Sequence, residues 1–203
     1  MKSFIILALL PLAYGGFFKS KGESYMDNIL KTALPYDVRN SYLDPARLSV
    51  YADTIQTPRG RVAANFTNGR LTGLSDVARK GSCSGPKYIG SYMSLNCTIS
   101  FKYIRAIFDG MSYAPGYYRF PAVGNVTSAY AKVEVVSTAA RNVPYVKAMA
   151  VYGLTFTPGK TAFLRSISDA ISRRSTPELY TLVGTNFRAV LHRTVSRYPM
   201  PLP

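Results

Sequence analysis

Residues 93–103, MSLNCTISFKY, alternate between apolar and polar side chains almost without interruption. Successive side chains of an extended chain point to opposite faces, so this period of two predicts a half-buried antiparallel strand. The apolar face of this strand either joins an ordinary core or lines a pocket for an apolar ligand. The residues expected on that face are Met93, Leu95, Cys97, Ile99, Phe101 and Tyr103, and those expected on the outer face are Ser94, Asn96, Thr98, Ser100 and Lys102.

More strands are predicted on both sides of this one. RVAANF and GRLTGL follow Pro58 and are separated by an Asn-Gly pair, which indicates a turn between strands of a meander. SAYAKVEVV and YVKAMAVYGLTF alternate in the same way and are expected to form a hairpin across STAARNVP. Many of their inward residues are small, which allows close approach of a packed helix or a ligand chain. The expected inward residues are Ala129, Ala131, Val133 and Val135 in the first strand, and Val146, Ala148, Ala150, Tyr152, Leu154 and Phe156 in the second.

The segment YAPGYYRFPAVG, residues 113–124, has four aromatic residues together with two prolines and two glycines. This composition predicts a loop with little regular structure. Its aromatic side chains either cover an open edge of the core or stand at the mouth of a cavity.

Helical spacing is found near both ends of the chain. ESYMDNILKTAL predicts a short amphipathic helix that ends at Pro35. KTAFLRSISDAISRR predicts a second helix, with Phe163, Leu164, Ile167, Ala170 and Ile171 on its apolar face.

A third and longer helix is predicted after Thr176, because this residue can act as an N-cap before Pro177 and Glu178. The helix is expected to run to Tyr198, a length of about 33 Å, which matches the roughly 36 Å of an eleven-residue strand. The sequence therefore predicts an α+β fold, in which a curved antiparallel sheet wraps around a long C-terminal amphipathic helix and a short N-terminal helix is added. The apolar stripe of the long helix consists of Leu179, Leu182, Val183, Phe187, Val190, Leu191 and Val195.

The first residues, MKSFIILALLPLAYGG, place one lysine before an apolar run from Phe4 to Leu12. Ala13 and Gly15 follow at the spacing of a cleavage site for a signal peptidase. We therefore expect a secretory signal peptide over residues 1–15 and one domain over residues 16–203. The apolar run is about half the roughly 20 residues that a membrane-spanning helix requires, so the mature protein is expected to be extracellular and not to span a membrane.

Three sites match the acceptor pattern for N-glycosylation, at Asn65, Asn96 and Asn125. Such sites belong on exposed positions, and Asn96 lies on the predicted outer face of the strand over residues 93–103. The matches agree with export, and we expect at least one of these sites to be glycosylated.

The two cysteines, Cys83 and Cys97, are separated by fourteen positions that include the turn-prone SGPK. In an oxidising compartment they could form a disulfide between neighbouring segments, worth roughly 3 kcal/mol by loop entropy. Two free buried thiols are the alternative. Their spacing does not match a metal site, and no metal or other cofactor is expected.

Lysine and arginine number 25 against 10 aspartate and glutamate residues, a formal net charge of +15. The excess is spread along the chain without a dense cluster. It favours an anionic partner, but it is equally compatible with a basic surface that has no specific partner.

Catalytic patterns are scarce. The single histidine, His192, lies among arginines on the predicted last helix, where a solvent-facing or capping role is expected. PGKT at residues 158–161 lacks the first glycine of a phosphate-binding loop, because Leu154 occupies that position. The acidic residues cannot be brought together from the sequence, and no nucleic-acid recognition motif is present. We expect neither an enzyme nor a nucleic-acid-binding protein.

The order of these elements resembles that of the tubular lipid-binding superfamily, in particular the secreted proteins similar to group-seven mite allergens and the juvenile-hormone-binding and takeout-like proteins. The likeness rests on FTNGRLTGLSDVARKGSCS, on the strand over residues 93–103 and on the helix from Thr176. The resemblance implies a strongly curved sheet around the long helix, with an apolar cavity between them for a lipid-like ligand.

Two functions follow as hypotheses. The first is a secreted, non-enzymatic carrier or scavenger of a hydrophobic small molecule or lipid. The second is a basic secreted protein that binds an anionic surface or partner, such as lipopolysaccharide, an acidic glycan or a host protein. For the carrier, the pocket is expected to be lined by Met93, Leu95, Ile99, Phe101, Leu182, Phe187 and Val190.

Overall fold

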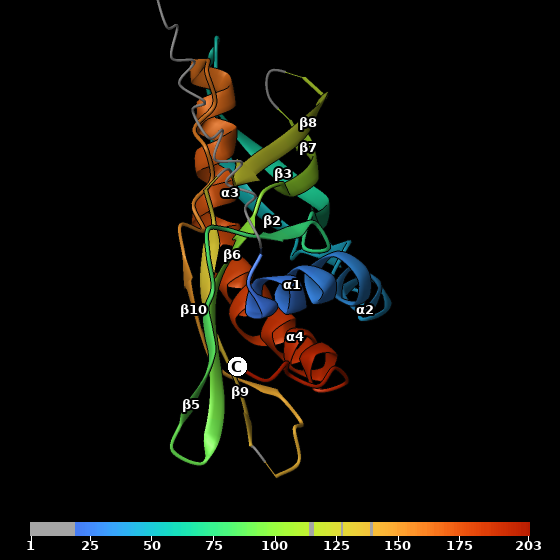
Figure 1. The fold of residues 1–203 in the computed structure, drawn as a ribbon. Coiled ribbons are helices and arrows are strands. Elements are labelled where there is room, and N and C mark those ends of the chain that lie inside the picture. The colour runs from blue at the N-terminus through green and yellow to red at the C-terminus, as the bar shows by residue number, and fades with distance from the viewer. Residues whose placement is uncertain (1–18, 114–115, 127, 139) are drawn as a thin grey trace, which may run out of the picture.

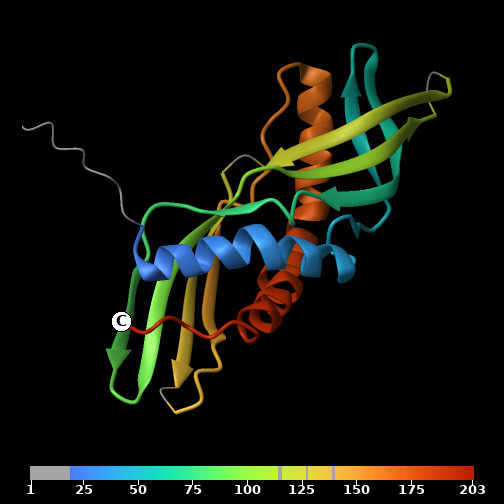
Figure 2. The same cartoon turned by 45° about the vertical axis from the view of Figure 1, so that its right-hand side comes forward.

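A computed structural model of the chain describes residues 19–113, 116–126, 128–138 and 140–203, so the predicted signal peptide over residues 1–15 lies outside it. Two antiparallel sheets are arranged along one long C-terminal helix, and a shorter N-terminal helix crosses between them (Figures 1 and 2). The predicted α+β class, with a sheet layer around a long helix, is confirmed.

The first sheet, called sheet A, packs against the first part of the long helix. Its strand order is β1-β3-β7-β8, and β2 pairs with the same edge of β3 as β1 does. All its strand pairs are antiparallel. The strands are β1 (Ala46–Arg47), β2 (Tyr51–Thr57), β3 (Gly60–Thr72), β7 (Ile104–Ser112) and β8 (Tyr118–Val126).

The second sheet, called sheet B, lies toward the C-terminal part of the long helix (Figure 2). Its order is β10-β9-β6-β4, and β5 pairs with β6. The predicted hairpin over residues 129–156 is present as the antiparallel pair β9 and β10. The strands are β4 (Val77–Arg79), β5 (Ser84–Ile89), β6 (Tyr92–Phe101), β9 (Tyr130–Thr138) and β10 (Tyr145–Tyr152).

Strand β6 is the strand predicted from the alternation of residues 93–103, and its expected inward side chains Met93, Leu95, Cys97, Ile99 and Phe101 are buried. Tyr103 differs from the prediction, because it follows the end of the strand and is 63% exposed. Ser94 also differs, since it is fully buried although it lies on the outer face.

The long helix is continuous, whereas the sequence predicts two helices with a break before Thr176. Pro177 lies inside it. Ile171 before this proline and Leu179 after it are both fully buried, so tertiary packing offsets the cost of about 3 kcal/mol that proline imposes within a helix. A π-helical turn follows the proline, and the axis bends there (Figure 2). The segments are α3 (Ala162–Thr181), η2 (Leu182–Phe187) and α4 (Arg188–Val195).

The apolar stripe predicted for the long helix is confirmed in its C-terminal part, because every member from Leu179 to Val195 is buried. In the N-terminal part, Ile167, Ala170 and Ile171 are buried, but Leu164 is 47% exposed.

The N-terminal helix passes through Pro35 and ends at Asn40, whereas the sequence predicts an end at the proline. A π-helical turn lies immediately before this position. The wider turn relieves the clash that a proline ring makes with the carbonyl one turn earlier, which explains how the helix continues. Its segments are α1 (Lys21–Asn28), η1 (Ile29–Ala33) and α2 (Leu34–Asn40).

Three predictions about the strands are wrong, two of them because of a β-bulge. Residues 60–72 form one strand through the predicted Asn-Gly turn, because Asn68, with φ of 52°, takes part in a bulge between Thr67 and Arg70. The predicted loop over residues 113–124 is largely strand β8, whose edge position in sheet A tolerates Pro121. The second bulge lies in β10. Val146 pairs with Val135 and Ala148 pairs with Glu134, so Lys147 is an extra residue, and the residues that follow it have their faces reversed. The reversal exposes Ala148, Ala150 and Tyr152, which were expected inside.

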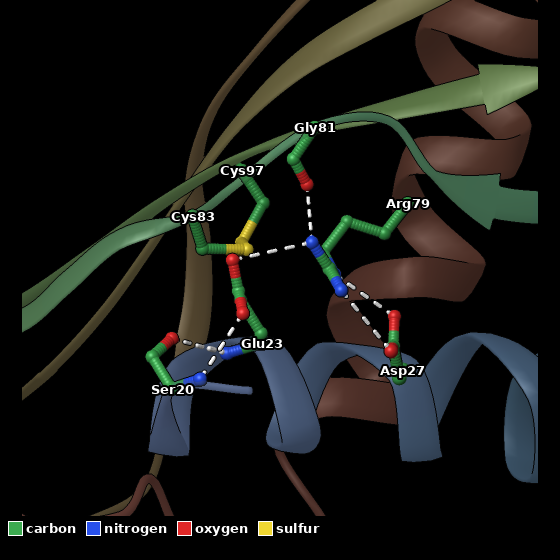
Figure 3. The surroundings of a disulfide bond; sticks show 7 residues. All are labelled: Ser20, Glu23, Asp27, Arg79, Gly81, Cys83 and Cys97. Carbon is green, nitrogen blue, oxygen red and sulfur yellow. Dashed lines mark hydrogen bonds and ion pairs between the residues drawn. A yellow bond between two sulfur atoms is a disulfide. The ribbon is translucent and has the colours of Figure 1, made fainter. Parts of the chain in front are cut away.

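The N-terminal helix is fixed to sheet B beside the Cys83–Cys97 disulfide (Figure 3). The predicted pairing of the two cysteines is confirmed. Arg79 Nε lies 2.9 Å from Asp27 Oδ1, and Arg79 Nη1 lies 3.4 Å from Glu23 Oε1. Gly22 lets the helix approach β5 and β6, since a Cβ there would lie 2.5 Å from the Gly85 carbonyl oxygen.

Both carboxyl groups of this ion pair network have lowered pKa values. The Ser20 backbone N–H, with help from Arg79, lowers the pKa of Glu23 below its ordinary 4.5. Burial acts to raise the pKa of Asp27, but hydrogen bonds from Arg79 and Lys19 outweigh it and hold the pKa below its ordinary 3.8. Because the folded-state pKa values are lowered, this network stabilises the protein above the ordinary values and stops doing so as the pH falls through the folded-state values.

We expect Arg79→Met to lower the free energy of unfolding at neutral pH, because Glu23 and Asp27 then lose their ion pairs with Arg79 and only Asp27 keeps a cation, Lys19. The difference from the unmutated protein should shrink as the pH falls below the ordinary pKa values of 4.5 and 3.8 and through the lowered folded-state values. Urea titrations over this pH range measure it. Arg61→Met, at an exposed position of β3, is the control and should show no such trend. A difference that stays constant with pH would contradict the electrostatic origin.

Candidate functional site

A row of aromatic side chains covers the inner face of sheet A. Tyr51 on β2 stacks on Phe66 of β3, with ring centroids 4.7 Å apart, and meets Phe108 of β7 edge-on at 5.3 Å. Phe66 also contacts Phe120 of β8 at 6.1 Å, and Phe120 contacts Phe163 of α3 at 5.6 Å. The row therefore runs from one side of the sheet to the first turn of the long helix.

Strand β7 makes room for this row with a glycine. A Cβ on Gly110 would lie 2.2 Å from the Phe120 ring, so only glycine allows the ring to lie flat over the strand at this point. Tyr118 stacks on the same Phe120 ring, with centroids 6.1 Å apart, and continues the aromatic surface toward the start of β8.

An open cavity of about 490 Å³ lies at this end of the row. It is bounded by the turn between β2 and β3, the connection between β7 and β8, and the start of α3. Its volume lies within the range of small-molecule sites, and its walls are mainly apolar and aromatic, as such sites usually are. The lining residues are Ile55, Thr57, Pro58, Arg59, Ser112, Gly116, Tyr117, Tyr118 and Phe163.

Two polar features accompany the cavity. Arg59 is the one ionisable cation among its lining residues and can pair with an acidic group of a ligand. The Tyr51 hydroxyl, at the other end of the aromatic row, is buried, with the Ser175 side chain as a polar neighbour. Burial raises the pKa of Tyr51, and the nearby Asp53 carboxylate raises it further.

A second groove of about 710 Å³ lies on the other side of the first turn of α3, where Leu164 takes part in its wall. Its floor is apolar, and Lys102, Arg105 and Lys160 are among its lining residues. The Thr157 backbone N–H donates to the Asn125 carbonyl at 2.7 Å and joins the segment before α3 to the edge strand β8. Phe163 and Leu164 therefore separate an aromatic cavity from a groove with basic groups.

The seven residues predicted to line a pocket all lie in the core between β6 and the η2–α4 part of the long helix. None of them is more than 9% exposed, and Phe101 meets Phe187 edge-on at 5.1 Å. Phe101 and Phe187 are in contact, while Leu95 lies against Gly22 of α1. Five cavities among the described residues have linings that include none of the seven except Val190. A ligand chamber at these seven residues stays a prediction.

The three glycosylation sites lie on strands. Asn96 on β6 and Asn125 on β8 are exposed, and Asn65 on β3 is half-buried, with its Nδ2 donating to the Tyr113 hydroxyl at 3.2 Å. Their glycosylation stays a prediction.

The aromatic cavity was missed in the sequence because its walls come from distant segments. Phe120 and Ala122 in YAPGYYRFPAVG alternate as in a strand and are both buried. The nearby Pro121 and Gly124 favoured a loop, so this strand was not predicted. The alternative that these aromatics stand at the mouth of a cavity was nevertheless left open, and Tyr117 and Tyr118 do line one.

His192 is exposed on α4, with its ring 6.1 Å from that of Tyr145. In the part of the chain that the structure describes, no group of three or more histidine, cysteine or acidic residues could hold a metal ion. Among the same residues, no helix has both the length and the hydropathy needed to cross a membrane.

Comparison with known proteins gives matches at the level of structure. No family model and no curated protein sequence matches the chain. Among solved structures, the chain is similar to lipopolysaccharide binding protein, with 13% identity and a TM-score of 0.47 over 89% of this chain and 39% of that one. It is also similar to Takeout 1 of Epiphyas postvittana, with 12% identity and a TM-score of 0.31 over 85% of this chain and 87% of that one.

The chain thus spans only 39% of the lipopolysaccharide binding protein. Both likenesses concern the fold, and the resemblance of the sequence to the tubular lipid-binding superfamily stays a prediction. At 12 and 13% identity and TM-scores below 0.5, the likenesses carry no inference about what this chain binds.

Proposed function

We propose that this protein is an extracellular, non-enzymatic carrier or scavenger of a hydrophobic small molecule or lipid, held in the aromatic cavity at the start of α3. The observation that carries the proposal is the cavity of about 490 Å³ at the end of the aromatic row, with its mainly apolar walls. Apolar burial supplies the binding energy, and Arg59 orients a ligand that has an acidic group.

The size of the cavity sets the expected affinity. A ligand that buries about 300 Å² of apolar surface gains about 7 kcal/mol from its removal from water. This gain corresponds to a dissociation constant on the order of micromolar, before the cost of immobilising the ligand is subtracted.

Export is part of the same proposal. The Cys83–Cys97 disulfide is typical of an oxidising compartment, and two of the three acceptor asparagines, Asn96 and Asn125, are exposed. A signal peptide over residues 1–15 and a single domain over residues 16–203 complete the proposal.

The cavity can be blocked at Gly116. Gly116 lines the cavity and no atom lies within 4 Å of a Cβ built there, so Gly116→Trp adds an indole at the cavity wall without a backbone clash. We expect the variant to bind the dye N-phenyl-1-naphthylamine about tenfold more weakly than the unmutated protein, because the indole takes the space of the ligand. Fluorescence titration measures the dissociation constant.

Gly184→Trp is the matched control, because a Cβ at this glycine of η2 also has no atom within 4 Å and the residue is not part of the cavity lining. It should bind the dye as the unmutated protein does. Equal binding by all three proteins would refute the aromatic cavity as the site and point to the chamber predicted at the seven core residues. Native mass spectrometry of the exported protein should also find a co-purified lipid or other apolar compound.

A further inference from the structure

Because of the bulge at Lys147, two small residues, Ala148 and Ala150, lie on the outer face of sheet B and form the floor of a hollow there. Val146 aligns with Val135 and Ala148 aligns with Glu134, so Lys147 has no partner of its own in β9. From this point on, Ala148 and Ala150 face outward and are exposed. Small side chains at these positions leave a depression that larger ones would fill.

A hollow of about 410 Å³ lies over this floor. Its remaining lining carries hydroxyl, amide and charged groups in addition to the backbone of three strands. Such groups can donate to and accept from the hydroxyls of a sugar, each of which is both a donor and an acceptor. The polar lining residues are Ser82, Ser84, Asn96, Thr98, Lys132 and Glu134.

Three pairs of tyrosine and lysine side chains lie on the same face as this hollow, and Lys132 of one pair is part of its lining. Lys80 Nζ lies 5.0 Å from the centre of the Tyr130 ring, and Lys132 Nζ lies 5.8 Å from that of Tyr152. The Tyr130 and Tyr152 rings stack on each other, with centroids 5.1 Å apart. A third pair, Lys147 Nζ over the Tyr92 ring at 5.3 Å, lies on the same face.

The charge of this face favours an anion. Glu134 is the one acidic residue in the lining of the hollow, and its Oε1 is already paired with Lys147 Nζ at 3.2 Å. Lys80 and Lys132 have no acidic partner among the ion pairs of the described residues, and both are exposed. Their ammonium groups therefore remain available to a carboxylate or sulfate group.

We propose that the outer face of sheet B binds an acidic saccharide. The sugar ring occupies the hollow over Ala148 and Ala150, and Lys80 and Lys132, which lie over the rings of Tyr130 and Tyr152, bind its acidic groups. A lipid is disfavoured here, because the face is polar apart from the tyrosine rings and the alanine floor. The site is distinct from the aromatic cavity, which lies on the inner face of the other sheet, so it stands independently of the carrier function.

The test uses the full mature chain, exported in a bacterial host that adds no N-glycan, so that Asn96 stays unmodified. Fluorescently labelled heparin octasaccharide is titrated and compared with a neutral dextran oligosaccharide of similar length. We expect the acidic probe to bind and the neutral one to bind much more weakly. Binding should weaken at higher ionic strength, because exposed charges are screened within about 8 to 10 Å near physiological salt.

Two sets of variants locate the site. The triple variant Lys80→Gln, Lys132→Gln, Lys147→Gln should bind the acidic probe about tenfold more weakly, because three cations of the face are removed. The control removes three exposed arginines from the outer face of sheet A, by Arg61→Gln, Arg70→Gln and Arg105→Gln, and lowers the net charge equally. Its affinity should change by no more than about threefold.

A variant that leaves the charge unchanged distinguishes binding in the hollow from non-specific electrostatic attraction. Ala150→Phe places a large side chain in the hollow at an exposed position and should lower the affinity for the acidic probe by about fivefold or more. The proposal is overturned if the arginine and lysine variants lose affinity equally, or if Ala150→Phe binds as the unmutated protein does. Tighter binding of a single-stranded oligonucleotide than of the saccharide would overturn it in favour of a nucleic acid. Dye binding in the aromatic cavity should be unchanged in every variant of this set, which keeps the two tests separate.

Discussion

Phe187→Ala should lower the free energy of unfolding by about 3–5 kcal/mol, a range typical of truncating a large buried aromatic side chain. Phe187 is 0% exposed, at the end of the π-helical turn where the long helix bends. It also meets Phe101 of β6 edge-on at 5.1 Å, a contact that adds to the effect of apolar burial. Urea-induced unfolding followed by circular dichroism measures the change.

Tyr180→Ala is the control on the same long helix, since Tyr180 is 44% exposed. Its effect should stay within about 0.5 kcal/mol. If Phe187→Ala costs less than about 1.5 kcal/mol, the ring does not lie in a closely packed core. That result would favour the ligand chamber predicted at these residues, in which a bound apolar molecule and not the protein fills the space.

The elements that could be predicted from the sequence are those whose burial follows one period over their whole length. In β6 the period of two continues from Met93 to Phe101, and in the long helix the apolar stripe continues from Leu179 to Val195. Each of these elements packs one face on the core, so the pattern of side chains is a direct consequence of the geometry of the element.

The elements that were wrongly predicted depend on interactions beyond the local sequence. Pro35 and Pro177 were expected to end or begin helices, but packing on both sides keeps each helix continuous. The strand around Lys147 was expected to be regular, because no local signal marks its bulge. The bulge near Asn68 was predicted as a turn, because the Asn-Gly pair is also typical of turns. The division of the strands into two sheets was not predicted, because pairing between distant strands leaves no mark on the hydrophobic pattern.

The candidate sites were harder to predict than the fold for the same reason. Ile55, Ser112 and Phe163 come from three distant segments and meet only in the folded chain. The saccharide face depends on the bulge at Lys147, since without it Ala148 and Ala150 would face the core as the alternation indicated. What the sequence did indicate was the chemistry available, namely an excess of basic residues, many tyrosines and alternating apolar faces.

Loss of the Cys83–Cys97 disulfide should lower the free energy of unfolding by roughly 3 kcal/mol, because the bond closes a loop across a sequence separation of 14 residues in the unfolded chain. The double variant Cys83→Ala, Cys97→Ala tests this expectation by urea titration under non-reducing conditions. The effect is expected to be large for one bond, since Cys83 lies at the start of β5, an outer strand whose only paired neighbour among the described residues is β6.

The unmutated protein under reducing conditions provides a second measurement of the same quantity and should lose a similar free energy. Agreement of the two values would show that the loss comes from the bond and not from repacking around alanine. A loss below about 1 kcal/mol in both would mean that β5, α1 and the Arg79 ion pairs hold this region together without the covalent link. Circular dichroism at zero denaturant should be the same in all three samples, because the ladder between β5 and β6 extends from Ser84 to Ile89 independently of the bond.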